Sequence, residues 1–222
     1  MEGFSIPYRA IMENLPLGTP VTITLEYDIK HSGAHAIDFL THYDRLQPHS
    51  PFGHSAESFD PISGVTGLSA TISTSLIPTP SSVGSPVVNQ PTTRFNSLPN
   101  NEKLMTLFGG TISNITYVSQ GDLTDNMAST SVSVTFVADS TNAVLAWGGY
   151  IAQEADWGAN QSAGGINGSP YHMRLIDWTI GNPGNQDRSL SAAAVAAPGS
   201  ITIVKNAEPD NNQDFVFSAT GN

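Results

Sequence analysis

The chain has 222 residues, only 12% of them are charged, and its formal net charge is −11 at pH 7. Three lysines and five arginines cannot form a basic surface that follows a phosphate backbone, which excludes a typical nucleic-acid-binding protein, and an anionic membrane would repel the chain. The lack of cysteine excludes disulfides, thiolate metal ligands and cysteine nucleophiles.

The first segment has the pattern of a β-strand. Phe4, Ile6, Tyr8 and Ala10 occupy every second position, which is the period of a strand with one buried face. Because this strand follows Met1 almost directly, we expect either that an export signal has been removed or that the sequence starts inside a longer polypeptide.

Strict alternation predicts two further strands, at residues 19–29 and 129–139. Turn-like segments rich in Gly, Pro, Asn and Asp separate such runs. This spacing predicts an all-β fold, an antiparallel β-sandwich of the Ig-like or jelly-roll-like kind, with one short helix and a long Ser/Thr/Pro-rich loop. The side chains expected in its core are Val21, Ile23, Leu25, Val132, Val134 and Phe136.

Five of the six histidines lie within residues 30–54. His31 and His35 have the spacing of two zinc ligands on one helical face, but Gly33 disfavours a helix between them. We therefore expect no metal here and a partly buried, hydrogen-bonded His35. The histidines expected to be accessible are His31, His42, His49 and His54.

Two segments interrupt the strand pattern. Residues 35–46 are expected to form the short helix, because Ala36, Phe39 and Leu40 fall on one helical stripe. Residues 61–100 hold six of the fifteen prolines and are expected to cross the surface, with one or two edge strands such as residues 65–73.

No residue pattern of an established catalytic site is present, and the GxSxG sequence of a serine nucleophile is absent. We therefore expect that the chain is not an enzyme. The alternative that the side chains leave open is a metal-dependent hydrolase that uses His35, Asp38, Asp44 and His172.

No cofactor is expected, with calcium as the alternative. Oxygen ligands for calcium occur in two turn-like segments, at Asp122 and Asp125 and at Asp210, Asn211, Asn212 and Asp214. The interpretation we favour is that Asp and Asn stand there because they stabilise turns.

Trp147, Tyr150 and Trp157 lie close together in sequence, with glycines between them. Such residues can form a platform for carbohydrate. They can also form a corner of a sandwich in which glycine lets the backbone approach a packed tryptophan, and this is the interpretation we favour.

The last residues divide into a linker and two strands. Residues 1–190 are predicted to form the sandwich domain, residues 191–199 a linker, and residues 200–222 a strand pair that pairs with the main sandwich, pairs with another chain or begins a further domain. The side chains expected to mediate assembly are Ile201, Ile203, Phe215 and Phe217 on these strands, with Phe4 and Ile6 at the edge that would receive them.

Seven phrases in this order resemble secreted or surface-anchored bacterial proteins with prealbumin-like or SpaA-type repeat domains. The phrases are EGFSIPYRAIMENLPLGTPVTITLEYD, KHSGAHAIDFLTHYD, NAVLAWGGYIA, ADWG, INGSPYHMRLIDW, GNQDRSL and PGSITIVKNAEPDNNQDFVFSATG. The resemblance implies an extracellular location and a β architecture, but no activity. It also implies that residues 200–222 begin a prealbumin-like domain, in which Lys205 occupies the position of a lysine that forms isopeptide bonds in some relatives.

The sequence as a whole predicts a structural extracellular module. We expect a subunit of a cell-surface layer, stalk or filament that associates head-to-tail, or with neighbouring domains of the same protein, by strand addition. An adhesive or carbohydrate-binding module is the first alternative, and the metal-dependent hydrolase is the second.

Overall fold

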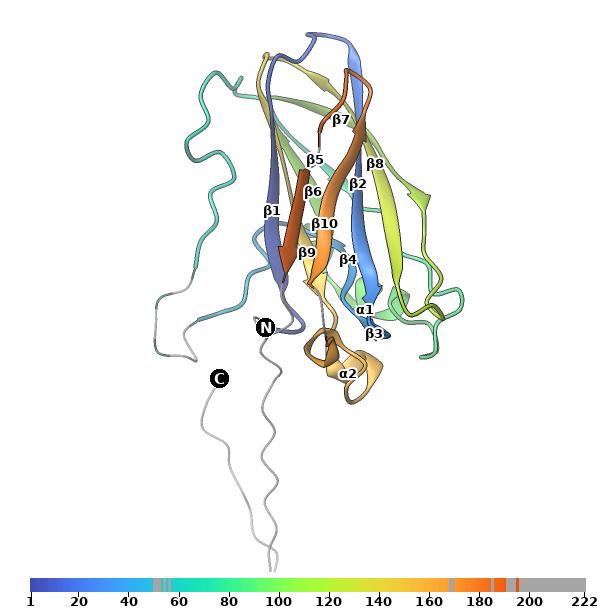
Figure 1. The fold of residues 1–222 in the computed structure, drawn as a ribbon. Helices are drawn as coiled ribbons and strands as arrows, with labels where there is room; N and C mark the ends of the chain where they lie inside the picture. The colour runs from blue at the N-terminus through green and yellow to red at the C-terminus, as the bar shows by residue number, and fades with distance from the viewer. Residues whose placement is uncertain are drawn as a thin grey trace, which may run out of the picture.

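The computed structural model describes residues 1–190, apart from 50–52, 54, 56, 168, 169 and 185, together with residue 195. Eleven strands account for most of the regular structure, and the fold is a sandwich of two antiparallel sheets, as predicted (Figure 1). In the part of the chain that the structure describes, no helix is both long and apolar enough to cross a membrane.

The first sheet is organised around β9 (Ala143–Ile151). One edge of β9 pairs with β1 (Ser5–Met12), and the other edge pairs in turn with β6 (Leu104–Phe108) and β4 (Ile37–Thr41). β5 (Ile72–Leu76) pairs with β6 and completes the sheet, so that β1 is its outer strand on one side, and β5 and the short β4 are its outer strands on the other.

The second sheet has the order β11-β10-β2-β8-β7. Its strands are β2 (Pro20–His31), β7 (Gly110–Ser119), β8 (Ala128–Ala138), β10 (Tyr171–Trp178) and β11 (Gln186–Leu190), and β3 (Ala34–His35) pairs with the end of β2. The helices are short: α1 (Thr92–Ser97), α2 (Glu154–Trp157) and two 3₁₀ turns, η2 (Asn100–Glu102) and η3 (Ala163–Gly165).

The core lies between the sheets and contains the residues that alternation predicts. On β2 and β8, Val21 is opposite Phe136, Ile23 opposite Val134 and Leu25 opposite Val132. All six side chains are 0% exposed. The predicted core faces are therefore confirmed.

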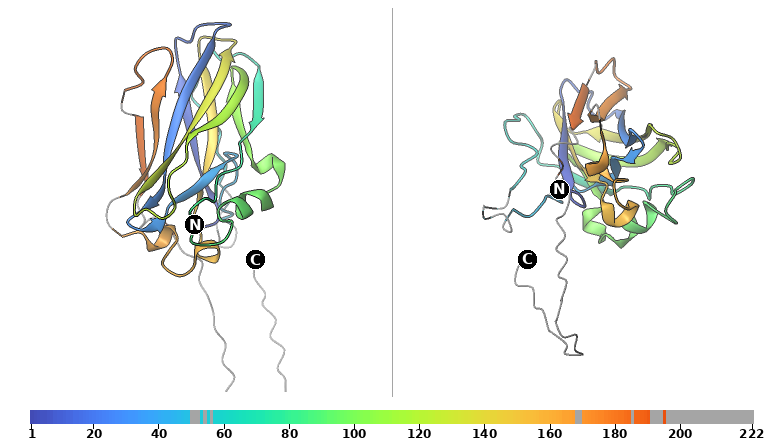
Figure 2. Two further views of the ribbon diagram at one scale, coloured as in Figure 1. Left: turned by 90° about the vertical axis from the view of Figure 1, so that its right-hand side faces the viewer. Right: turned by 60° about the horizontal axis from the view of Figure 1, so that its bottom comes forward.

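The two sides of the sandwich differ. On one side the chain passes from β6 to β7 through Gly109 and Gly110, and the Ile112 amide donates a hydrogen bond to the Ser73 hydroxyl on β5 at 3.1 Å, which joins the sheets. On the other side β1 and the β10–β11 hairpin face each other (Figures 1 and 2), and no hydrogen bond joins them among the described residues.

The prediction of a helix for residues 35–46 is wrong. This segment contains the end of β3 and all of β4. Every residue of β4 is buried, Asp38 and Thr41 included, so its two faces do not differ in polarity and its sequence does not distinguish a strand from a helix. The long segment 61–100 contains one edge strand, β5, whereas the helical turns of α1 stand where no helix was expected.

Replacing Phe136 by Ala is expected to lower the free energy of unfolding by about 3–5 kcal/mol, because a large buried ring leaves a cavity between the sheets. Denaturant titration measures this loss. Ser133→Ala, on the opposite face of the same strand, is the matched control and is expected to change stability by less than about 0.5 kcal/mol. Equal effects of the two substitutions would contradict the assigned core face.

Candidate binding groove

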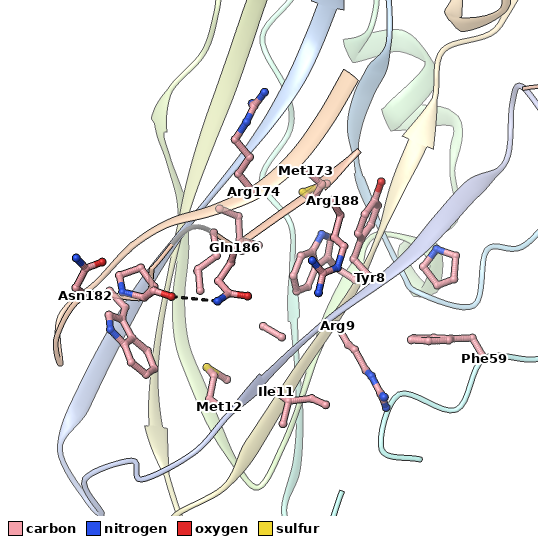
Figure 3. A pocket seen from close by; sticks show the side chains of 17 residues that line it. Tyr8, Arg9, Ile11, Met12, Phe59, Met173, Arg174, Asn182, Gln186 and Arg188 are labelled. Carbon is pink, nitrogen blue, oxygen red and sulfur yellow. Dashed lines mark hydrogen bonds between the residues drawn. The ribbon is translucent and has the colours of Figure 1, made fainter. Parts of the chain in front are cut away.

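A groove of about 670 Å³ lies on the side of the sandwich where the sheets are not joined, between β1 and the β10–β11 hairpin (Figure 3). Such a volume is within the range of protein sites that bind small ligands or side chains. The groove is lined by strands of both sheets, so its walls are held by the same core that holds the sandwich together.

The first wall is formed by β1 and by the strand beside it, β9. Tyr8 is opposite Trp147 in the register of these strands, and their rings stack at 6.0 Å between centroids. Trp147 is only 4% exposed, and its indole Nε1 has no hydrogen-bond partner among the described residues. Burial also raises the pKa of Tyr8 well above its ordinary value. This wall is therefore aromatic and poorly hydrated.

The second wall is formed by Met173, Leu175 and Trp178 on β10. They share the inner face because β10 contains a bulge: Leu175 is opposite Leu25, whereas Trp178 is opposite Ile23 with one extra residue between them. The extra residue is Ile176, which is 45% exposed and does not line the groove. If all the residues of β10 were kept and alternated regularly, Trp178 would face solvent.

Two arginines at the groove make no ion pair within the described ranges. Arg9 donates hydrogen bonds to the carbonyl oxygens of Pro61 at 2.8 Å and Ser63 at 2.9 Å. Arg188 donates only to the carbonyl oxygen of Asp187, at 2.8 Å. The other three arginines are paired with carboxylates: Arg45 with Glu102, Arg94 with Asp156, and Arg174 with Glu26, Asp28 and Asp187.

The backbone of β1 beside the groove is only partly available for pairing. Phe4 accepts the β9 ladder bond from Ile151, so the odd-numbered residues of β1 direct their backbone groups away from β9. The Ser5 amide already donates a hydrogen bond to the backbone carbonyl oxygen of Arg45, and Pro7 has no amide hydrogen. Arg9 and Ile11 are the positions of this edge that can accept a further strand.

The four residues of the hydrolase alternative do not form one site. His35 and Asp38 both contact Trp157: the rings of His35 and Trp157 stack at 3.3 Å, and Trp157 Nε1 donates to both Asp38 oxygens at 3.0 Å. Asp44 pairs with His42, while His172 pairs with Asp187 at 2.7 Å. Among the described residues, no group of three or more His, Asp or Glu side chains is arranged to hold a metal ion.

His35 and Asp38 are buried, and burial moves their pKa values in opposite directions. Burial, followed by the charge of Lys30, lowers the pKa of His35 to about 3. Burial raises the pKa of Asp38 well above its ordinary value, against the opposing hydrogen bond from Trp157. Both shifts favour the uncharged side chains, which is what a packed corner of the core requires.

The other histidines are less exposed than expected. The burial predicted for His35 is confirmed, at 1% exposed, but its Nδ1 has no hydrogen-bond partner within the described residues. His31 is 5% exposed, because β2 extends to it and pairs with β3, so its predicted accessibility is wrong. His42 and His49 are half-buried, and His54 lies outside the described residues.

The aromatic residues expected as a platform or a corner are in the core. Trp147, Tyr150 and Trp157 are at most 4% exposed, so together they form no exposed platform. Gly148, between Trp147 and Tyr150, lets the end of β4 lie close to β9, since a Cβ at this position would lie 2.5 Å from the Thr41 hydroxyl and 2.6 Å from the His42 carbonyl oxygen. The packed-corner interpretation describes these residues.

The remaining predicted sites are local or lie outside the described residues. A carboxylate oxygen of Asp122 accepts hydrogen bonds from the Thr124 amide at 2.8 Å and hydroxyl at 2.7 Å, which stabilises the turn and lowers the pKa of Asp122. The candidates beyond the described residues are Ile201, Ile203, Lys205, Asp210, Asn211, Asn212, Asp214, Phe215 and Phe217.

Searches among protein-family models, curated proteins and solved structures found no match to this chain.

The variant His35→Phe is expected to unfold less readily in acid than the parent. Since the folded state holds the pKa of His35 near 3 and the ordinary value is 6.5, His35 contributes stability above pH 6.5 that is lost as the pH falls towards 3. Phenylalanine retains the stacking on Trp157 but does not titrate.

The free energy of unfolding, measured by denaturant titration between pH 7 and pH 4, tests this expectation. The parent should lose up to about 1.4 kcal/mol per pH unit more than the variant over this interval. Parallel pH profiles for the two proteins would show that His35 takes up its proton without unfolding.

Proposed function

We propose that this chain is a non-catalytic structural module of an extracellular or cell-surface assembly, in which a strand of one subunit is added to the sandwich of the next. The observation that carries the proposal is that β1 is an outer strand beside an apolar groove. Its residues Arg9 and Ile11 direct their backbone groups away from β9.

An outer strand with an apolar surface is normally protected against pairing with other chains. In β1 the protection is confined to one half: Pro7 lacks a donor, and the Ser5 amide is occupied by Arg45. In the other half Ile11 is 46% exposed and lines the groove. The unprotected half is therefore suited to accept a strand.

The residues first expected to receive that strand have other contacts. The Arg45 guanidinium lies 5.7 Å from the centre of the Phe4 ring, and Ile6 is half-buried against the core. In the proposal, the receiving edge therefore shifts along β1 from Phe4 and Ile6 to Arg9 and Ile11.

The sequence supplies candidate donors. Residues 201–205 and 214–220 alternate apolar and polar side chains, so each has a face to bury and backbone groups that need partners. The linker before them, residues 191–199, is uncharged and ends in Pro-Gly. The sparse charge of the chain and its resemblance to surface-anchored proteins also support an extracellular role.

A chain that ends at Pro198 tests this function. Every buried core side chain among the described residues precedes this position, so we expect the shortened chain to fold. We expect it to remain monomeric, whereas the complete chain assembles in a concentration-dependent way, as measured by light scattering and electron microscopy. Assembly of the shortened chain would contradict strand addition from the tail.

The groove favours one alternative function, that of a carbohydrate-binding or adhesive module. Tyr8 and Trp178, both half-buried at the groove, provide aromatic surface of the kind that packs against sugar rings. Binding of soluble glycans to the monomeric shortened chain, without any binding of a peptide of the tail sequence, would support this alternative over the structural role.

A further inference from the structure

We propose that the groove between β1 and the β10–β11 hairpin is the receiving site for residues 200–222 of a second copy of this chain, with Ile201 and Ile203 entering the groove and Arg9 and Arg188 binding the acidic residues that follow. This inference rests on the proposed function and specifies the partner, the contact surface and the head-to-tail direction of the assembly.

The apolar side chains of the donor match the lining of the groove. Ile201 and Ile203 lie on one face of the segment 201–205, separated by Thr202. Apolar side chains line both walls of the groove, Tyr8 and Trp147 on one side and Met173, Leu175 and Trp178 on the other, and the polar lining consists of Arg9, Arg174, Asn182, Gln186 and Arg188. A strand that pairs with Arg9 and Ile11 would direct alternate side chains between these walls.

Charge complementarity also favours the tail as the segment that binds in the groove. Beyond Lys205, the tail carries Glu208, Asp210 and Asp214 before its second apolar strand. Arg9 and Arg188 are the two arginines without a carboxylate partner in the described part of the chain, and both line the groove. An acidic segment would give them partners in an assembly of otherwise acidic subunits.

The positions of the donor and of the receiving edge favour a second copy over the same chain. Leu190, where β11 ends, is opposite Tyr171 at the end of the sandwich where β1 begins (Figure 1). The receiving half of β1, Arg9 to Met12, lies towards the other end. β11 thus ends at one end of a subunit and the receiving edge lies near the other, an arrangement that suits a head-to-tail assembly that does not close.

Binding of a synthetic peptide with the sequence of residues 200–222 to the chain that ends at Pro198 tests the site directly. Isothermal titration calorimetry measures the affinity, and the fluorescence of the groove tryptophans reports the contact. Leu175→Glu places a charge on the groove wall and is expected to weaken binding by at least about tenfold. Ile176→Glu, the next residue on the exposed face, is the matched control and is expected to bind as the parent does.

The arginines provide a second test with little risk to folding, since both side chains are exposed. Replacing Arg9 and Arg188 by Glu is expected to weaken peptide binding by about tenfold or more at low salt, with a smaller loss at high salt. A peptide with Glu208→Gln, Asp210→Asn and Asp214→Asn should bind the parent less tightly. It should bind the variant that carries both arginine substitutions at least as tightly as the acidic peptide does.

The outcomes separate this inference from the proposed function. If removal of the tail abolishes assembly but Leu175→Glu and the arginine variant both assemble as the parent does, strand addition holds and the groove is not the site. If the complete chain stays monomeric and does not bind the peptide, whereas the shortened chain does bind it, the tail occupies the groove of its own chain. The assignment of the groove to a second copy is then wrong. If no peptide binds and no assembly forms, both proposals are wrong.

Discussion

The first sheet depends on the backbone of β9, which hydrogen-bonds to three other strands. β1 follows one edge of β9, while β6 and β4 share the other edge. Every residue of β9 is buried, and Gly148 stands where the Thr41 side chain and the backbone beyond β4 come too close for a Cβ. Because β9 holds β1 in place, it also sets the position of the groove wall and of the edge beside it.

Buried carboxylates stabilise the end of the sandwich near α2 through hydrogen bonds from neighbouring groups. Glu2 accepts bonds from the Glu154 and Gly164 amides at 2.9 and 2.7 Å and from the Ser162 hydroxyl at 2.7 Å, which ties the N-terminal residues to α2 and η3. Asp156 accepts a bidentate bond from Arg94. An acidic chain with few bases thus pairs three of its five arginines with its own carboxylates, and Arg9 and Arg188 differ in having no carboxylate partner among the described residues.

Sequence pattern predicts those parts of the fold in which one face of a strand is buried and the other is not. The core faces of β2 and β8 follow directly from alternation. From Val21 to Leu25 and from Val132 to Phe136, buried apolar residues alternate with half-buried Thr and Ser residues that lie on the opposite face. β4 lacks this signal because both of its faces are buried. The burial of His31 was missed because it results from pairing with β3 rather than from any local pattern.

The groove could not be predicted in the same way. Tyr8, Trp147 and Trp178 are distant in sequence, and they line one groove only because of the strand order and one bulge. The bulge at Ile176 lets β10 contain one residue more than its partner strand without reversing the groove wall. Deleting Ile176 would leave Asp177 opposite Thr24 and Trp178 opposite Ile23, so the strand would lose its bulge and keep the Trp178 ring on the inner face. Two related chains that differ by this one residue would therefore present the same aromatic wall, whereas an insertion or deletion elsewhere in β10, where no bulge takes it up, would turn the ring to solvent.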